Sequence, residues 1–237
     1  MEAFRRIKAG NLVWLAREPL PVMEDPEASL NDAARFIKSS RVVTIARVAP
    51  NLILRRLNYG KFIHRLRDWF RPSRAVRALI ASTWLEQAGI RTPRALAAAD
   101  VRVLRWPRRA YFVTEEVPGA RTLASIYESK RKIPREIADL IAHLHHSGLS
   151  HRDLKWTNIL LDEQLTPWLV DLDGVRRLGS VPERRAIEDL WTLARCFTAY
   201  PITLKWSGAR FLYRYCALRK LPFTPWAKAL VRRIGRG

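Results

Sequence analysis

Two nearby stretches decide the fold: His151-Arg152-Asp153-Leu154-Lys155-Trp156-Thr157-Asn158 and Val170-Asp171-Leu172-Asp173-Gly174. An apolar helical pattern that ends at Gly148 precedes the first stretch, and two short apolar strands, about 159–161 and 168–171, lie between the two stretches. Phosphoryl transfer to a hydroxyl requires a carboxylate near the acceptor, a cation near the moving phosphate and oxygen ligands for Mg²⁺. The two stretches supply all of these groups, and this predicts phosphoryl-transfer chemistry.

The first stretch resembles the catalytic loop HRDxKxxN of the protein-kinase-like superfamily, and the second resembles its metal-binding turn. The resemblance implies that Asp153 orients the acceptor hydroxyl and accepts its proton, while Lys155 neutralises charge on the γ-phosphate. It also implies ATP and Mg²⁺ as cofactors, with Asn158 and Asp171 as metal ligands. The alternative is a pair of charged surface turns, and the ordered co-occurrence of helix, loop, strands and turn argues against it.

The resemblance also assigns residues to nucleotide binding, with departures from the family pattern. Arg55 stands in the strand position where the superfamily has lysine, and arginine keeps the charge but changes its geometry. The segment 38–41, where a phosphate-covering loop is expected, contains no glycine, so its backbone approaches phosphates less freely than the superfamily pattern allows. The backbone of Glu115 to Val117 is the predicted adenine contact, and an ordinary turn between domains is the alternative.

Two acidic residues on predicted helices have possible roles in the same pattern. Glu86 is the candidate partner for the strand cation, although it falls in the last turn of its helix. Asp189 lies in Glu188-Asp189-Leu190-Trp191, which resembles the helix whose aspartate binds the catalytic-loop backbone; an exposed helical aspartate is the alternative.

The resemblance implies an α+β, two-lobed, protein-kinase-like fold. Apolar periodicity and chain breakers agree with it, because they indicate a small sheet interrupted by helices in the N-terminal half and helices after about Pro182. A mainly β N-terminal lobe, residues 1–116, would bind the nucleotide, and a mainly helical C-terminal lobe, residues 117–237, would carry the catalytic loop and metal-binding turn. Residues 1–37 give no clear pattern. The predicted elements further along are a hairpin of strands at 42–45 and 52–54, a basic amphipathic helix over 61–71, a helix from Ser73 to about Ala88, strands at 101–104 and 111–114 around a Pro107 turn, a hinge at Pro118-Gly119, and helices after about Pro182.

The composition indicates a folded protein that binds a polyanion. The chain has 237 residues with 43 Lys and Arg against 22 Asp and Glu, a net charge of +21. Residues 51–110 hold 14 basic and three acidic residues, and residues 190–237 hold ten basic and no acidic residues. Such fields favour nucleic acid, an anionic membrane surface or a phosphorylated substrate. Cys196 and Cys216 lack metal spacing, and no signal peptide or membrane span is evident, so a cytosolic compartment is expected.

Spacing separates the substrate classes. Asp189 comes only 15 positions after Gly174, which leaves no room for the activation segment of protein kinases. The sequence resembles the lipopolysaccharide kinase (Kdo/WaaP, InaA-type) family over about residues 35–200. The residues that carry this resemblance are Leu54-Arg-Arg-Leu-Asn58, the basic stretch 61–77, Ala88-Gly-Ile-Arg-Thr-Pro93, Thr114-Glu115 with Pro118-Gly119, and the 151–174 core.

The family resemblance implies ATP-dependent phosphorylation of a Kdo or heptose sugar in the lipopolysaccharide inner core. The partners would be a lipid A-core glycolipid and an anionic membrane, with the protein peripheral on the cytoplasmic face of the inner membrane; nucleic acid is not favoured, and no feature specifies an oligomeric state. Basic and aromatic residues in 61–71 and in the tail fit a membrane surface, or the aromatics fill the helical core. Two alternatives stay open, a RIO-like atypical protein kinase that contacts RNA and a membrane-associated pseudokinase.

Overall fold

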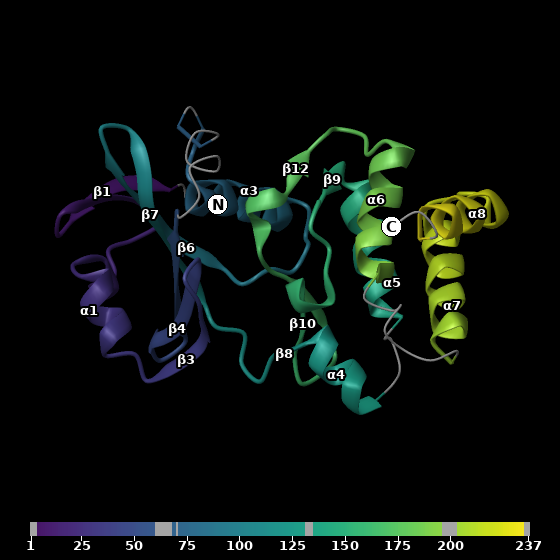
Figure 1. Cartoon of the computed structure of the whole chain (residues 1–237), viewed down its shortest axis with the longest axis horizontal. Helices are drawn as coiled ribbons and strands as arrows, with labels where there is room; N and C mark the ends of the chain where they lie inside the picture. Colours follow the sequence, from purple (N-terminus) through teal and green to yellow (C-terminus); the bar gives the residue numbers. More distant parts are fainter. Residues whose placement is uncertain (1–3, 60–67, 70, 131–134, 196–202, 235–237) are drawn as a thin grey trace. The chain divides into compact units, whose positions relative to one another are not determined.

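The structure is a computed structural model that describes residues 4–59, 68–69, 71–130, 135–195 and 203–234 (Figure 1). The chain divides into two compact units. The first unit comprises residues 1–83 and 93–118, and the second comprises residues 84–92 and 119–237. The main division therefore falls between Pro118 and Gly119, while the segment Trp84–Thr92 groups with the second unit. The predicted basic helix over 61–71 lies largely outside the described residues.

The first unit is built on a seven-stranded sheet in which every neighbouring pair is antiparallel. In spatial order its strands are β1 (Arg5–Ala9), β2 (Leu12–Ala16), β6 (Ala95–Val103), β7 (Trp106–Glu115), β5 (Leu52–Asn58), β4 (Val43–Ala49) and β3 (Arg35–Ser39). The predicted hairpin is confirmed as β4 and β5. Asn51 takes a positive φ of 62° in its turn, a conformation that asparagine tolerates better than most residues.

Residues 5–31, which the sequence left unassigned, complete the core of this unit. Strands β1 and β2 extend the sheet, and a short 3₁₀ helix η1 (Pro21–Met23) and helix α1 (Pro26–Asn31) follow them. Trp14 is fully buried, and its indole N–H donates to the carbonyl of Met23 at 3.2 Å. Both pack with Leu54 and Val113 of the central strands, so the extension covers apolar surface that the central strands would otherwise expose.

The predicted helix after Ser73 is confirmed as α3 (Arg74–Gln87), and the division between the units falls within it after Thr83. Ser73 caps its start, because the hydroxyl oxygen accepts from the amide of Val76 at 3.2 Å. Gly89 follows the helix with a φ of 68°, the left-handed conformation typical of a C-terminal cap.

The prediction of a turn at Pro107 is wrong. The β6–β7 hairpin turns at Leu104 and Arg105, which have φ values of 49° and 67°. Pro107 lies inside β7 opposite Arg102, next to a register shift between Val101 and Arg102. Such an irregularity accommodates a residue that has no amide hydrogen.

The second unit is mainly helical (Figure 1). Its helices are α4 (Leu123–Lys130), α5 (Glu136–His146), α6 (Glu183–Arg195), α7 (Thr203–Leu218) and α8 (Phe223–Ile234), with 3₁₀ turns η2 (Trp156–Asn158) and η3 (Leu172–Gly174). Its short strands are β8 (Arg121–Thr122), β9 (Leu149–Ser150), β10 (Ile159–Leu161), β11 (Pro167–Leu169) and β12 (Arg176–Arg177). The apolar face of α5 predicted from the sequence is confirmed, since Ile137, Leu140, Ile141 and Leu144 are all buried.

Candidate active site

The loop 151–158 begins at a closely packed turn after α5. Gly148 has a φ of 73°, and a Cβ at this position would lie 2.3 Å from the carbonyl oxygen of Gly179. The backbone of Gly148 also accepts a hydrogen bond from the amide of Leu178 at 2.8 Å. Strand β9 then pairs with β12, which places Ser150 opposite Arg176. Residues 148–150, just before the loop, are therefore bonded to residues 176–178, which follow Asp171 in the chain.

Asp189 of α6 binds the loop backbone, as its sequence context indicated. Its carboxylate is 1% exposed, and Oδ1 accepts from the amide of Arg152 at 2.8 Å. Oδ2 accepts from the amide of His151 at 3.0 Å and from the hydroxyl of Ser150 at 2.7 Å. Burial alone would raise the pKa of Asp189, but hydrogen bonds from His145, Ser150 and Arg152 outweigh it and lower that pKa. The carboxylate stays ionised inside the unit.

Arg152 has a left-handed backbone with a φ of 68°. This conformation costs about 1–2 kcal/mol for a residue with a Cβ atom. The hydrogen bond from the Arg152 amide to Asp189 offsets that cost and fixes the turn that leads into Asp153.

Three of the residues predicted for the site lie together in this loop. The Lys155 ammonium is 2.7 Å from Oδ1 of Asp153 and donates to its Oδ2 at 2.9 Å. Both side chains are close to half exposed, at 42% for Asp153 and 46% for Lys155, so an acceptor molecule can reach them. Asn158 is buried, and its Nδ2 donates to the backbone carbonyl of Asp153 at 2.8 Å. The amide of Asn158 thus closes the loop on itself.

Asp171 lies beside this loop because the preceding residue, Val170, is hydrogen-bonded to it. The amide of Val170 donates to the carbonyl of Asn158 at 3.0 Å, and Nε2 of His151 donates to the carbonyl of Val170 at the same distance. Asp171 itself has a left-handed φ of 63° at the start of η3. A Cβ on Gly174 would lie 3.1 Å from the carbonyl of His151, so the turn approaches the loop closely.

The donor set suits a hard cation. Nδ2 of Asn158 donates to the Asp153 carbonyl, so Oδ1 is the side-chain atom of Asn158 that can bind a cation. An amide oxygen together with the Asp171 carboxylate is the kind of sparse oxygen set that holds Mg²⁺ with water and substrate phosphates. The part of the chain that the structure describes has no group of three or more His, Cys, Asp or Glu able to hold a metal. These residues fit Mg²⁺ rather than a structural zinc site.

The residues predicted to bind the nucleotide belong to the first unit. Arg55 lies in the middle of β5, opposite Ile45 of β4 and Phe112 of β7, and is half-buried. The amide of Glu115, at the end of β7, donates to the carbonyl of Arg94 at 2.9 Å. Val117, two residues further along, is half-buried. Arg55 therefore lies on β5, Glu115 at the end of β7 and Val117 just after that strand.

Two local features of this unit bear on nucleotide binding. The amide of Glu116 donates to the carbonyl of Asn51 at 2.8 Å, so this amide and that of Glu115 would have to give up existing bonds to contact a base. The glycine-free turn between β3 and β4 is closed by Ser40, whose hydroxyl accepts from the amide of Val43 at 3.0 Å. This turn is short and internally bonded, unlike a glycine-rich loop whose amides are available to phosphates.

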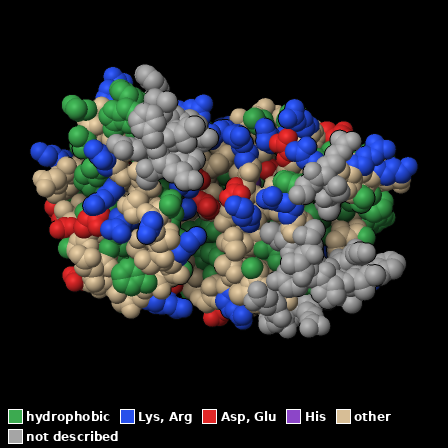
Figure 2. Space-filling view, viewed as in Figure 1, with side chains coloured by type: hydrophobic (Ala, Val, Ile, Leu, Met, Phe, Trp, Pro, Cys, Tyr) green, Lys and Arg blue, Asp and Glu red, His purple; other side chains and the backbone are tan. Residues whose placement is uncertain are grey.

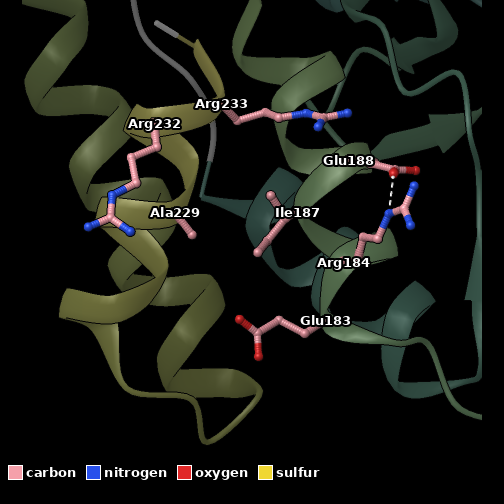
Figure 3. A pocket seen from close by; sticks show the side chains of 7 residues that line it. All are labelled: Glu183, Arg184, Ile187, Glu188, Ala229, Arg232 and Arg233. Carbon is pink, nitrogen blue, oxygen red and sulfur yellow. Dashed lines mark hydrogen bonds and ion pairs between the residues drawn. The ribbon is translucent and has the colours of Figure 1, made fainter. Parts of the chain in front are cut away.

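A separate groove of about 390 Å³ lies between α6 and α8. Figure 3 shows Ile187 and Ala229 facing its interior, while Arg232 points away and Arg184 is paired with Glu188 at 3.2 Å. None of the predicted site residues lines it. Within the described residues, no helix has the length and apolar character required of a membrane span.

The fold and the loop define a phosphotransferase of the protein-kinase-like class. The family model described as "Lipopolysaccharide kinase (Kdo/WaaP) family" matches residues 28–215, and the chain belongs to this family. It is therefore an enzyme that transfers a phosphoryl group to an alcohol acceptor, and the predicted family and fold class are confirmed.

Curated relatives include the 3-deoxy-D-manno-octulosonic acid kinase of Vibrio parahaemolyticus, which is 25% identical over 71% of this chain and 77% of that protein. The enzyme of the same name from Vibrio cholerae is 33% identical over 44% of this chain and 47% of its own length. Among solved structures, "WaaP in complex with acyl carrier protein" is similar with a TM-score of 0.63 and 18% identity, over 90% of this chain and 92% of that one. WbdD is similar with a TM-score of 0.58 and 16% identity, over 86% of this chain and 50% of that one.

Proposed function

We propose that this protein phosphorylates a hydroxyl of a Kdo or heptose sugar in the lipopolysaccharide inner core, with ATP as the donor. The observation that carries the proposal is the loop in which Asp153, Lys155 and Asn158 lie together, held by the buried Asp189. Family membership supports the class of acceptor. The short connection from Gly174 to α6 also supports it, because this connection is too short to form the activation segment with which protein kinases bind peptide substrates.

Each residue of the loop has a definite role in this proposal. Asp153 orients the acceptor hydroxyl and accepts its proton, and Lys155 neutralises charge on the phosphate in transit. Asn158 and Asp171 would hold Mg²⁺, which neutralises the phosphate oxygens of ATP when bound. Arg55 would bind phosphates from β5, with residues 1–116 serving as the nucleotide-binding lobe and 117–237 as the catalytic lobe.

The adenine contact in this proposal falls on the backbone of Glu115 and Val117. Because the amide of Glu115 is bonded to Arg94, we assign the contact to the carbonyl of Glu115 and the backbone of Val117. Main-chain recognition of this kind depends little on side-chain identity, which explains why the hinge sequence is not distinctive.

The proposal is tested by transfer of labelled phosphate from Mg-ATP to Kdo-lipid A, to a heptosylated core and to a generic protein, each offered in parallel. The variant Asp171→Ala serves as the blank. Label on one glycolipid alone is expected, and the labelled acceptor identifies the sugar. Label on protein alone would instead favour a RIO-like protein kinase, and no label above the blank would favour a pseudokinase.

An anionic membrane surface is the second partner in this proposal, with α8 as the contact. The outer face of α8 carries Lys228, Val231 and Arg232, which are all exposed, and Val231 is 68% exposed. Figure 2 shows Lys and Arg side chains gathered over α8. Two tail aromatics instead fill the core, since Tyr215 and Trp226 are buried. The membrane-facing part of the tail is therefore its basic face, on a protein placed at the cytoplasmic side of the inner membrane.

The variant Lys228→Glu/Arg232→Glu is expected to weaken binding to vesicles that contain anionic lipid by at least about tenfold, because each basic residue near such a surface contributes about 1 kcal/mol. Sedimentation with phosphatidylcholine vesicles containing phosphatidylglycerol measures this. The variant Arg105→Glu/Arg108→Glu makes the same change of charge on the β6–β7 hairpin. Equal losses in the two variants, or equal binding to pure phosphatidylcholine, would contradict a membrane contact at α8.

A further inference from the structure

A chain of buried hydrogen bonds leads from α7 to the catalytic loop. Tyr215 of α7 and His145 of α5 are both essentially without solvent exposure. The Tyr215 hydroxyl is 2.7 Å from Nδ1 of His145, and Nε2 of that imidazole is 3.2 Å from Oδ2 of Asp189. Asp189 in turn holds the loop amides. The three side chains come from three different helices, α5, α6 and α7.

The protons in this chain can be assigned from chemistry. Asp189 is an ionised acceptor, because its pKa is lowered, so the facing Nε2 of His145 carries a hydrogen and donates it. In the neutral imidazole Nδ1 is then an acceptor, and the group facing it must donate. Tyr215 can do so, because burial raises the pKa of its hydroxyl and keeps it protonated. One tautomer of His145 satisfies every atom.

We infer that Tyr215 is a positioning residue for phosphoryl transfer, which acts through His145 on Asp189 and hence on the backbone at Arg152. The inference rests on the proposed function. The Tyr215 hydroxyl donates to Nδ1 and holds the His145 ring in the orientation in which Nε2 donates to Oδ2 of Asp189, and this leaves Oδ1 aimed at the Arg152 amide. The left-handed turn before Asp153 depends on that last bond. Helix α7 thereby contributes to the geometry of the loop.

Removal of the hydroxyl isolates this effect from packing. In Tyr215→Phe the ring remains, and with it the edge contact on His145 and the packing on Trp226, both with centroids 5.7 Å apart. Nδ1 of His145 then loses its donor in a buried site. Without that donor the ring is no longer held in the plane that points Nε2 at Asp189, and rotation of the imidazole weakens the bond to Asp189.

The kinetic test compares Tyr215→Phe with Tyr213→Phe, a matched variant on the same helix whose ring is 65% exposed. Tyr215→Phe is expected to lower kcat for labelled transfer to Kdo-lipid A by roughly three- to tenfold. The KM for ATP should stay unchanged, because Tyr215 touches neither substrate. Tyr213→Phe should match the wild type. Wild-type kcat in Tyr215→Phe would overturn the inference.

A second measurement does not depend on activity. The ¹⁵N shifts of the His145 ring report its tautomer, and amide hydrogen exchange at His151 and Arg152 reports the hold on the loop. Tyr215→Phe is expected to shift the Nδ1 signal, because that nitrogen loses its hydrogen-bond donor, and to speed exchange at these two amides, while Tyr213→Phe changes neither. Unchanged shifts and exchange would refute the inference even in a protein that transfers phosphate. If the wild type transfers none, the proposed function fails while this measurement still decides the role of Tyr215 in holding the loop.

Discussion

Asp153→Asn is expected to slow phosphate transfer by roughly 10²- to 10⁴-fold, the usual contribution of a positioned proton acceptor. The amide that replaces the carboxylate cannot take the proton of the acceptor hydroxyl at neutral pH. It also weakens the contact with the Lys155 ammonium, which lies 2.7 Å from Oδ1 of Asp153. Labelled transfer to Kdo-lipid A, at saturating Mg-ATP, measures the loss.

The fold should survive this substitution. The contacts that shape the loop use the backbone of residue 153, whose carbonyl accepts from the Lys155 amide at 2.9 Å and from Nδ2 of Asn158 at 2.8 Å. The lost ion pair is nearly half exposed, and such pairs contribute about 0–1 kcal/mol to stability. Asp139→Asn, which removes an equivalent charge from the α5 surface pair with Arg214, is the control. Transfer by Asp153→Asn at the rate of this control would remove Asp153 from its proposed role.

The catalytic loop was predictable because its signal is local. His151 to Asn158 and Val170 to Gly174 form within short stretches, and the bonds that close them, such as Asn158 to the Asp153 carbonyl, span five residues. Helix α3 was predictable for the same reason, since Ser73 and Gly89 mark its ends. Such features are determined by residues close together in the sequence and depend little on the rest of the chain.

The N-terminal strands and the β6–β7 turn were not predictable in this way. Strands β1 and β2 are five residues each, and β2 is stabilised by pairing with β6, more than 80 residues away in the sequence. Leu104 and Arg105 take positive φ values that neither residue type signals. Pairing across the sheet decides both features. Pro107 suggested a turn, but a proline can also lie within a strand beside a register shift, as it does here.

The hydrogen-bonded chain behind the loop shows the same limit at the site. The helix motif singled out Asp189, but the sequence alone did not show whether its side chain is exposed or buried; in the structure it is 1% exposed. His145 and Tyr215 are 70 residues apart, and a tyrosine in a basic, aromatic helix gives no sign of its buried partner. The only signal available was the even spacing of apolar residues in α5 that places His145 on the buried face.

Asp189→Asn is the second substitution with a large expected effect, and it acts on both stability and transfer. The best rotamer of the amide keeps its oxygen on the side of Ser150, His151 and His145. Its NH₂ group then faces the amide of Arg152, where two donors meet with no acceptor between them. A buried pair of this kind costs about 2–5 kcal/mol, which is a large share of the stability of a domain.

Transfer should fall at least tenfold in Asp189→Asn, because the left-handed turn at Arg152 loses the bond that holds it and Asp153 follows it in the chain. Thermal unfolding and labelled transfer, measured at a temperature where the variant is still folded, separate the two effects. Glu183→Gln makes the same chemical change at an exposed position in the first turn of α6; it should lower stability by no more than about 1 kcal/mol, through the helix dipole, and leave transfer unchanged. Wild-type transfer in folded Asp189→Asn would show that the loop keeps its geometry without this carboxylate.

The acid dependence of stability gives Asp189→Asn an independent test. The pKa of Asp189 in the folded protein lies below its ordinary value of 3.8, because its hydrogen bonds favour the ionised form. The stabilisation from this carboxylate is therefore complete above pH 3.8 and is lost as the pH falls through the lower folded-state pKa. The difference in unfolding free energy between the wild type and Asp189→Asn should be constant from about pH 5 to 7 and should narrow below pH 3.8. A difference that stays constant into acid would mean that the asparagine variant is destabilised through packing and not through the loss of an ionised acceptor at position 189.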